Sequence, residues 1–154
     1  MPKLNHFDLN EYPSFVTTKT AGNVNRFSAP ELAELVVESL LFGNEEDWYD
    51  LISFVVMPDH LHFIVVPEDR SLSNIVSSIK GYTAKKVNEE LDRKGPVWED
   101  GFYDYVLDTR EKLVSRIQYI ENNPVEAEIA ENPEDYSYSG INYREELDAD
   151  EYLK

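Results

Sequence analysis

The stretch Asp50-Leu51-Ile52-Ser53-Phe54-Val55-Val56-Met57-Pro58-Asp59-His60-Leu61-His62-Phe63-Ile64-Val65-Val66 contains two apolar segments separated by a proline and an aspartate. Near-continuous apolar residues before and after this break are typical of strands that are buried on both faces. Because Pro58-Asp59 is a turn signal, the sequence predicts a β-hairpin with strands over 48–57 and 60–66.

His60 and His62 open the second of these strands and are two of the three histidines in the chain. Alternate residues of a strand point to the same face, so both imidazoles are predicted to lie side by side, where they could bind one metal ion. Two histidines are only half of a four-coordinate site, and exposed His-x-His pairs also occur without a ligand. The spacing alone leaves both interpretations open.

Two further strands and three helices are expected around the hairpin. Residues 14–20 and 102–107 are rich in β-branched and aromatic side chains, which favours strands. Apolar residues at helical spacing predict helices that run from Ser28-Ala29-Pro30-Glu31 to Gly43, over 72–94, and from Thr109 to Asn123, where Pro124 follows. The resulting order, β-α-β-β-α-β-α, predicts an α+β fold: a ferredoxin-like (split βαβ) antiparallel sheet with an additional C-terminal helix.

The length of 154 residues fits one domain over 1–154, with a core over about 12–130 and an acidic, tyrosine-rich tail over 131–154 that wraps the surface or frays. The absence of cysteine excludes disulfides, thiolate zinc sites and cysteine nucleophiles. No apolar run approaches the roughly 20 residues of a membrane span, and no signal-peptide pattern opens the chain. We therefore expect a cytoplasmic protein with no membrane contact.

The net charge of −17 opposes contact with a polyanion unless the charges are segregated. Residues 71–95 are the only net-positive stretch, with 5 basic and 3 acidic residues. Basic side chains there and on the following helix are candidates for phosphate contact, although lysines more often form a solvated face. These DNA-binding candidates are Lys80, Lys85, Lys86, Lys112 and Arg116.

The helix expected over 109–123 has two distinct faces. Leu113, Ile117 and Ile120 form an apolar stripe, whereas Tyr119 and Asn123 lie one turn apart on a polar stripe. A phenol and a carboxamide therefore lie side by side, either as a partly exposed tyrosine on a solvated face or as part of a site. Tyr82 is a rival nucleophile, although its position beside Ile79 favours packing at the edge of the core.

Several motifs occur in an order that resembles the single-tyrosine HUH transposases, and within them the REP-associated tyrosine transposases. The resemblance extends from about Tyr12 to Tyr138. The motifs are Met57-Pro58-Asp59-His60-Leu61-His62, Val97-Trp98-Glu99-Asp100-Gly101-Phe102, Tyr119-Ile120-Glu121-Asn122-Asn123-Pro124-Val125-Glu126-Ala127 and Asn132-Pro133-Glu134-Asp135-Tyr136-Ser137.

This resemblance implies a metal-dependent endonuclease and strand transferase, a transposase, that acts on single-stranded DNA with hairpin or repeat-palindrome structure. Tyr119 would be the nucleophile that forms a 5′-phosphotyrosine, and His60, His62 and Asn123 would be ligands of a divalent metal, Mg²⁺ or Mn²⁺. Relatives complete the site either within one chain or across a homodimer, and the sequence does not decide between the two. The alternatives are a non-catalytic or regulatory protein that binds structured nucleic acid and a metal-binding protein that never contacts nucleic acid.

Overall fold

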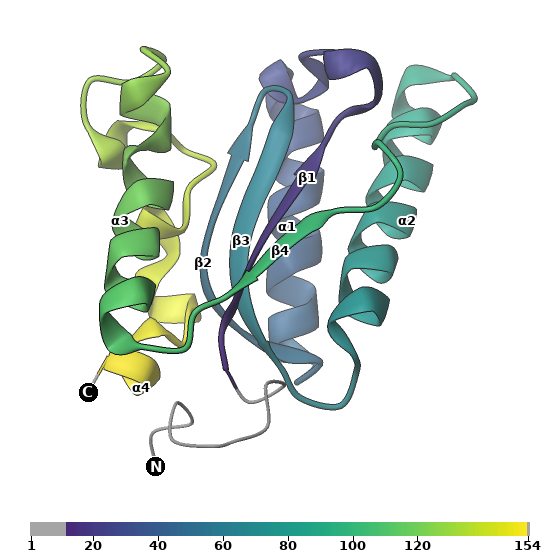
Figure 1. Ribbon diagram of the computed structural model, residues 1–154. Helices are drawn as coiled ribbons and strands as arrows, with labels where there is room; N and C mark the ends of the chain where they lie inside the picture. Colours follow the sequence, from purple (N-terminus) through teal and green to yellow (C-terminus); the bar gives the residue numbers. More distant parts are fainter. Residues whose placement is uncertain (1–11, 154) are drawn as a thin grey trace.

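Residues 12–153 are described in the computed structural model, and they form a four-stranded antiparallel sheet with helices on both faces (Figure 1). The sheet order is β2-β3-β1-β4, with antiparallel pairing throughout. The predicted element order and the ferredoxin-like α+β fold are confirmed. The main elements are β1 (Ser14–Lys19), α1 (Pro30–Glu45), β2 (Tyr49–Met57), β3 (His60–Pro67), α2 (Leu72–Leu91), β4 (Tyr103–Val106), α3 (Arg110–Glu126) and α4 (Ala149–Leu153).

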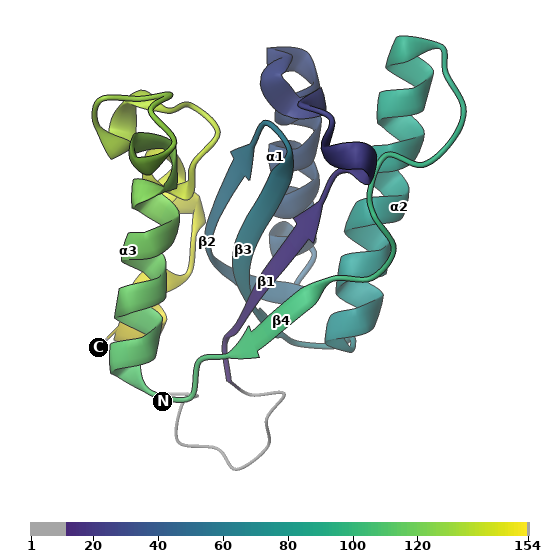
Figure 2. The same ribbon diagram turned by 45° about the horizontal axis from the view of Figure 1, so that its top comes forward.

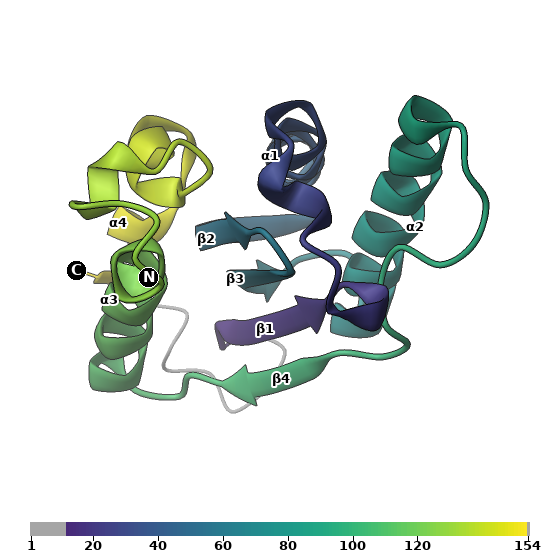
Figure 3. The same ribbon diagram turned by 90° about the horizontal axis from the view of Figure 1, so that it is seen from above.

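The sheet separates two hydrophobic cores. Helices α1 and α2 lie on one face, and α3 and α4 lie on the other (Figures 2 and 3). Along β3, Leu61 and Phe63 pack in the core under α1 and α2, whereas Ile64 and Val66 pack in the core under α3. Strand alternation therefore directs His60 and His62 toward α3. Within the described residues, no helix combines the length and apolar character needed to cross a bilayer.

The predicted hairpin is confirmed, because only Pro58 and Asp59 connect β2 to β3. Met57 pairs with His60, and the pairing continues to Tyr49 opposite Pro67, with a register shift between Leu51 and Ser53. Such a bulge changes which side chains face each core. The histidines are next to the turn, where the register is regular.

Helix α1 differs from its prediction at both ends. It begins at Pro30, and Ala29 occupies the N-cap position without a side-chain hydrogen bond, so Ser28 does not cap the helix. It continues through Gly43 to Glu45. Gly43 lies against the buried ring of Tyr49, and a Cβ at this position would overlap that ring. The glycine therefore permits a close approach inside the helix and does not end it.

Gly43→Ala is expected to lower the free energy of unfolding by about 1–3 kcal/mol, because the added methyl group overpacks against Tyr49. Alanine normally stabilises a helix interior by about 1 kcal/mol relative to glycine, so the sign is reversed at this position. Gly81→Ala in α2 is the matched control, since a Cβ there meets nothing within 4 Å. Urea unfolding of both variants measures the difference. Equal stabilisation of both would contradict the close contact at Gly43.

Pro124 lies inside α3, although the sequence predicts that the helix ends before it. Proline removes one backbone donor, but the turns after it are still closed. The N–H groups of Ala127 and Ile129 donate to the carbonyls of Asn123 and Pro124, each at 3.0 Å. Helix α3 therefore continues to Glu126, and Asn123 is held in a complete helical turn.

The chain after α3 packs along β2 and does not fray. The short 3-10 turns η5 (Pro133–Asp135) and η6 (Gly140–Glu146) lead to α4. The Val56 N–H donates to the Tyr138 carbonyl at 2.9 Å, so this segment covers the outer edge of β2. Tyr152 of α4 is buried in the core under α3, and its hydroxyl contacts Asp50.

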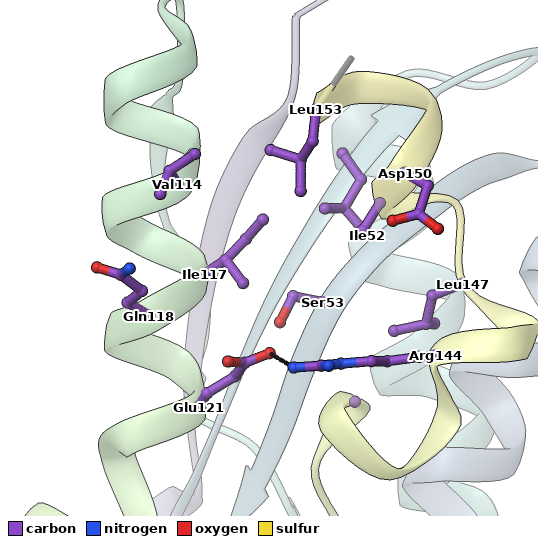
Figure 4. Close-up of a pocket in the computed structure, with 12 residues that line it drawn as sticks. Ile52, Ser53, Val114, Ile117, Gln118, Glu121, Arg144, Leu147, Asp150 and Leu153 are labelled. Atoms are coloured by element: carbon purple, nitrogen blue, oxygen red, sulfur yellow. Dashed lines mark hydrogen bonds and ion pairs between the residues drawn. The ribbon is translucent and has the colours of Figure 1, made fainter.

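A cavity of about 340 Å³ lies between α3, β2 and the C-terminal segment (Figure 4). Ile52, Ile117 and Leu153 line its apolar part, and Arg144 donates to Glu121 across it at 3.4 Å. Its lining includes neither of the paired histidines nor Tyr119. The cavity is therefore separate from the site that the sequence predicts.

Candidate active site

The two histidines lie side by side on the sheet face that carries α3. Their ring centroids are 4.6 Å apart, which confirms the predicted placement on one face. Strand β1 pairs with β3 so that Lys19 is opposite His60 and Thr17 is opposite His62. The pair therefore lies on an inner strand, next to the turn that precedes it, with β2 on one side and β1 on the other.

Each histidine is oriented by a hydrogen bond to its Nδ1 atom. Nδ1 of His62 is 2.8 Å from Oγ1 of Thr17, and Nδ1 of His60 is 2.7 Å from Oδ1 of Asp59. A second partner of this kind fixes the ring orientation of a metal-ligating histidine and leaves Nε2 for the metal. Asp59 directly precedes His60 in the sequence, whereas the contact of Thr17 with His62 depends on the strand register, which the sequence pattern does not reveal.

His62 is uncharged near neutral pH. Its side chain is 6% exposed, and burial, reinforced by the positive charges of His60, Arg116 and Lys19, lowers its pKa to about 3. Phe15 stacks on the ring with centroids 5.1 Å apart, which adds to its burial. A neutral imidazole is the form that can bind a metal ion.

Helix α3 brings the other two predicted residues to the histidines. Thr109 caps the helix by accepting from the Lys112 N–H, and Leu113 and Ile120 are buried against the sheet. This fixes the rotation of the helix, so the predicted apolar and polar stripes are confirmed. Tyr119 is 46% exposed.

Tyr119 and Asn123 meet the histidine pair within one chain. The rings of Tyr119 and His62 make an edge contact with centroids 5.6 Å apart. Oδ1 of Asn123 is 3.3 Å from Nε2 of His60, so the asparagine side chain reaches the pair. The four residues converge without any contribution from a second subunit.

The donor set fits a divalent cation. Two ligand atoms at right angles around an ion, each about 2.1 Å from it, are about 3 Å apart, close to the 3.3 Å between Nε2 of His60 and Oδ1 of Asn123. Among residues 12–153, no three histidine, aspartate or glutamate side chains gather to form an alternative site. Two imidazoles and an amide oxygen suit Mn²⁺ and are compatible with Mg²⁺.

Arg116 lies between Tyr119 and the sheet. Its guanidinium carbon is 4.6 Å from the ring centroid of Phe15, 5.4 Å from that of Tyr105 and 5.1 Å from that of Tyr119. Within the described part of the chain, it forms no ion pair with a carboxylate. A guanidinium held by aromatic rings in this way keeps its donors available for a phosphate.

The predicted basic residues do not form one surface. Lys112 is on the same helix as Arg116, and its Nζ atom forms an ion pair with Oδ1 of Asp108 at 2.8 Å. Nζ of Lys80 donates to the carbonyls of Glu99 and Gly101, each at 2.6 Å, and so anchors the loop before β4. Its burial lowers its pKa.

The other two predicted lysines, Lys85 and Lys86, belong to α2, as Lys80 does. This helix covers the face of the sheet opposite the histidines. Lys85 is exposed, and Lys86 lies 3.7 Å from Glu89. Tyr82 is on the same helix and is 50% exposed, so it does not pack at the edge of the core as predicted. Its position on the far face also separates this rival nucleophile from the histidine pair.

The sequence matches a known protein family over most of its length. Residues 25–123 match the sequence model of a family described as "Transposase IS200 like". The chain belongs to the IS200-like transposase family. Such transposases are DNA-cleaving enzymes, and the matched segment includes His60, His62 and Tyr119 and ends at Asn123.

Solved structures support the fold of this IS200-like chain. A REP-associated tyrosine transposase bound to a REP hairpin is similar with a TM-score of 0.70 and 18% identity, over 86% of this chain and 78% of that one. A transposase candidate from Deinococcus radiodurans R1 is similar with a TM-score of 0.50 and 18% identity, over 71% of this chain and 88% of that one. No protein of curated function matches the sequence.

Proposed function

We propose that this chain is a metal-dependent single-strand DNA endonuclease and strand transferase that acts through a 5′-phosphotyrosine on Tyr119. The observation that carries the proposal is the convergence of the histidine pair, Tyr119 and Asn123 within one chain. Membership of a transposase family supports DNA cleavage, and the hairpin bound by a relative of similar fold supports hairpin DNA as the substrate. In this proposal, all four site residues come from the same chain.

Cleavage begins with the attack of the Tyr119 hydroxyl oxygen on the phosphorus of the scissile phosphodiester. The bond from this oxygen to phosphorus forms, and the bond from phosphorus to the 3′ oxygen of the preceding nucleotide breaks. The phenol proton passes to a solvent base, and the departing oxygen takes up a proton to become a 3′-hydroxyl. Arg116, whose guanidinium carbon is 5.1 Å from the Tyr119 ring centroid, is placed to bind the phosphate.

His60, His62 and Asn123 would hold the divalent cation. When bound, such an ion polarises a non-bridging phosphate oxygen and helps to align the scissile bond for in-line attack. Thr17 and Asp59 keep the two imidazoles in place through their Nδ1 atoms. The phosphotyrosine conserves the energy of the broken bond, so a second 3′-hydroxyl can attack it and join two strands.

A cleavage assay with labelled hairpin DNA tests this function. Hairpins with single-stranded flanks are incubated with the protein in the presence of Mn²⁺ or of a chelator, and the products are separated on a denaturing gel. We expect cleavage and a slowly migrating covalent adduct only with the metal ion. Binding without cleavage in every metal condition would instead support a non-catalytic nucleic-acid-binding protein.

Thr17→Val is expected to weaken Mn²⁺ binding by about tenfold to a hundredfold, because it removes the hydrogen bond that orients His62. Thr18→Val is the matched control, since Thr18 is the adjacent residue of β1 and points to the other face. Isothermal titration calorimetry of both variants gives the affinities. Equal affinity in the two variants would show that Thr17 does not support a metal ligand.

A further inference from the structure

Three strands place a row of side chains next to the histidines on the face that carries α3. His62 pairs with Thr17, which pairs in turn with Tyr103 of β4. In the adjacent row, Phe15 pairs with Tyr105. Directly paired residues of antiparallel strands point to the same face, so Tyr103 and Tyr105 share the face of the histidines.

Helix α3 covers this part of the sheet only in part. Lys112 and Arg116 of α3 line a hollow with Tyr105, whereas the hollow beside Tyr103 has no α3 residue in its lining. Its main strand contacts are with β2 and β3, and β4 is the strand at the opposite edge of the sheet from β2. Tyr103 is 67% exposed and Tyr105 is 45% exposed. Two tyrosine rings therefore lie open to solvent within the same surface as the candidate nucleophile. We call Tyr103 and Tyr105 together the β4 tyrosine pair.

Each tyrosine of the pair has a cation beside it. Nζ of Lys19 is 5.9 Å from the ring centroid of Tyr103, and the guanidinium carbon of Arg116 is 5.4 Å from that of Tyr105. Within residues 12–153, neither cation forms an ion pair with a carboxylate. Arg116 also contacts the ring of Tyr119, so it connects the β4 tyrosine pair to the candidate nucleophile.

The charge around this surface is uneven, so some parts of it favour phosphates more than others. Glu99 and Asp100 line a hollow of about 230 Å³ together with Lys19 and Tyr103, which disfavours a phosphate at that end. The acidic C-terminal segment lies along β2, at the other edge of the sheet. Phosphates are therefore favoured near Arg116, and uncharged bases are favoured over the tyrosine rings.

We propose that the β4 tyrosine pair is a stacking platform for unpaired bases next to the scissile phosphate, with Lys19 and Arg116 as flanking cations. The proposal rests on the proposed function and adds the residues that hold the substrate strand. Base–aromatic stacking depends on the flat ring faces and is tolerant of sequence. The platform would therefore position single-stranded DNA beside Tyr119 and would not read its base sequence.

The test is a binding experiment with two hairpins that share a stem and a single-stranded flank. One flank carries normal bases, and the other carries abasic sites at the same positions. Tyr103→Ala and Tyr105→Ala are each expected to weaken binding to the normal flank by about tenfold, and to leave binding to the abasic flank unchanged. Tyr103→Phe and Tyr105→Phe should bind like the unmodified protein, because the ring is retained.

Tyr82→Ala is the matched control, since Tyr82 is also half exposed and has Lys86 5.7 Å from its ring centroid, but lies on α2 over the other face. Thermal melting of all variants checks that they fold.

Equal losses of affinity on normal and abasic flanks, or no loss on either, would overturn the platform. If unmodified protein still forms the covalent adduct in that case, the proposed function stands without it; if it neither binds nor cleaves, both fail. A change of sedimentation from dimer to monomer in the alanine variants, without an effect on DNA binding, would assign the surface to self-association and contradict the proposal.

Discussion

Tyr119→Phe is expected to abolish the covalent protein–DNA adduct and to reduce strand cleavage by at least about a thousandfold, while leaving DNA binding nearly unchanged. The physical reason is that only the hydroxyl oxygen is removed, and this oxygen is the attacking atom. The ring contacts with His62 and Arg116 are retained, so the helix and the site keep their shape. Denaturing gels give the cleavage rate and adduct yield, and fluorescence anisotropy gives the affinity.

Tyr82→Phe is the control for this experiment. It removes a hydroxyl from a half-exposed tyrosine on the opposite face of the sheet and should leave the rate and the adduct yield unchanged. Undiminished adduct in Tyr119→Phe would remove Tyr119 from the mechanism. Loss of the adduct in Tyr82→Phe but not in Tyr119→Phe would identify Tyr82 as the nucleophile.

Removal of divalent cations is expected to have the second large effect, a loss of cleavage of about a thousandfold that added Mn²⁺ reverses. This corresponds to roughly 4 kcal/mol of transition-state stabilisation, the range expected when charge on a phosphate is neutralised by a metal ion. His60→Ala should show the same loss and should not be rescued at Mn²⁺ concentrations that saturate the unmodified protein. His60 is better suited to this test than His62, because His62 is buried against Phe15 and its truncation would also disturb the core.

The control for metal removal is binding of the same DNA in the same chelator. Binding should fall far less than cleavage, because Arg116 and the β4 tyrosine pair do not depend on the metal ion. Cleavage that proceeds at an undiminished rate in chelator would contradict the assignment of His60, His62 and Asn123 as ligands.

The sequence predicts those parts of the fold and the site that depend on local periodicity. Alternation along 60–66 places both histidines on one face, and the helical wheel separates Tyr119 from Leu113 and Ile120; the structure has both features. Tyr119 and Asn123 are far from the histidines in sequence, by up to 63 residues. Local periodicity cannot predict that they meet, and at the level of the sequence only the resemblance to a family suggests it.

Features that depend on tertiary contacts could not be predicted in this way. A glycine such as Gly43 often ends a helix. In the structure it lies inside the helix, because the ring of Tyr49 packs against it and leaves no room for a Cβ atom. Thr17 becomes a partner of His62 only through the register of β1 and β3. The β4 tyrosine pair has the same origin, since its place beside the site follows from the pairing of β4 with β1.

The C-terminal segment illustrates the same limit. Its short 3-10 turns have no extended periodicity that a pattern could detect, and it is held by distant partners. The Tyr136 hydroxyl donates to the Val56 carbonyl at 2.5 Å, and Tyr152 is buried in the core under α3. Both contacts couple the end of the chain to β2, which also positions β3 and its histidines.

The most direct test of the central claim is to identify the amino acid that becomes linked to DNA. The protein is incubated with a single-stranded hairpin substrate and Mn²⁺, the adduct is digested with protease and nuclease, and the modified peptide is sequenced by mass spectrometry. We predict a nucleotide attached through its 5′-phosphate to Tyr119. A phosphotyrosine at Tyr82 or at any other position, or cleavage without a covalent adduct, would contradict the account.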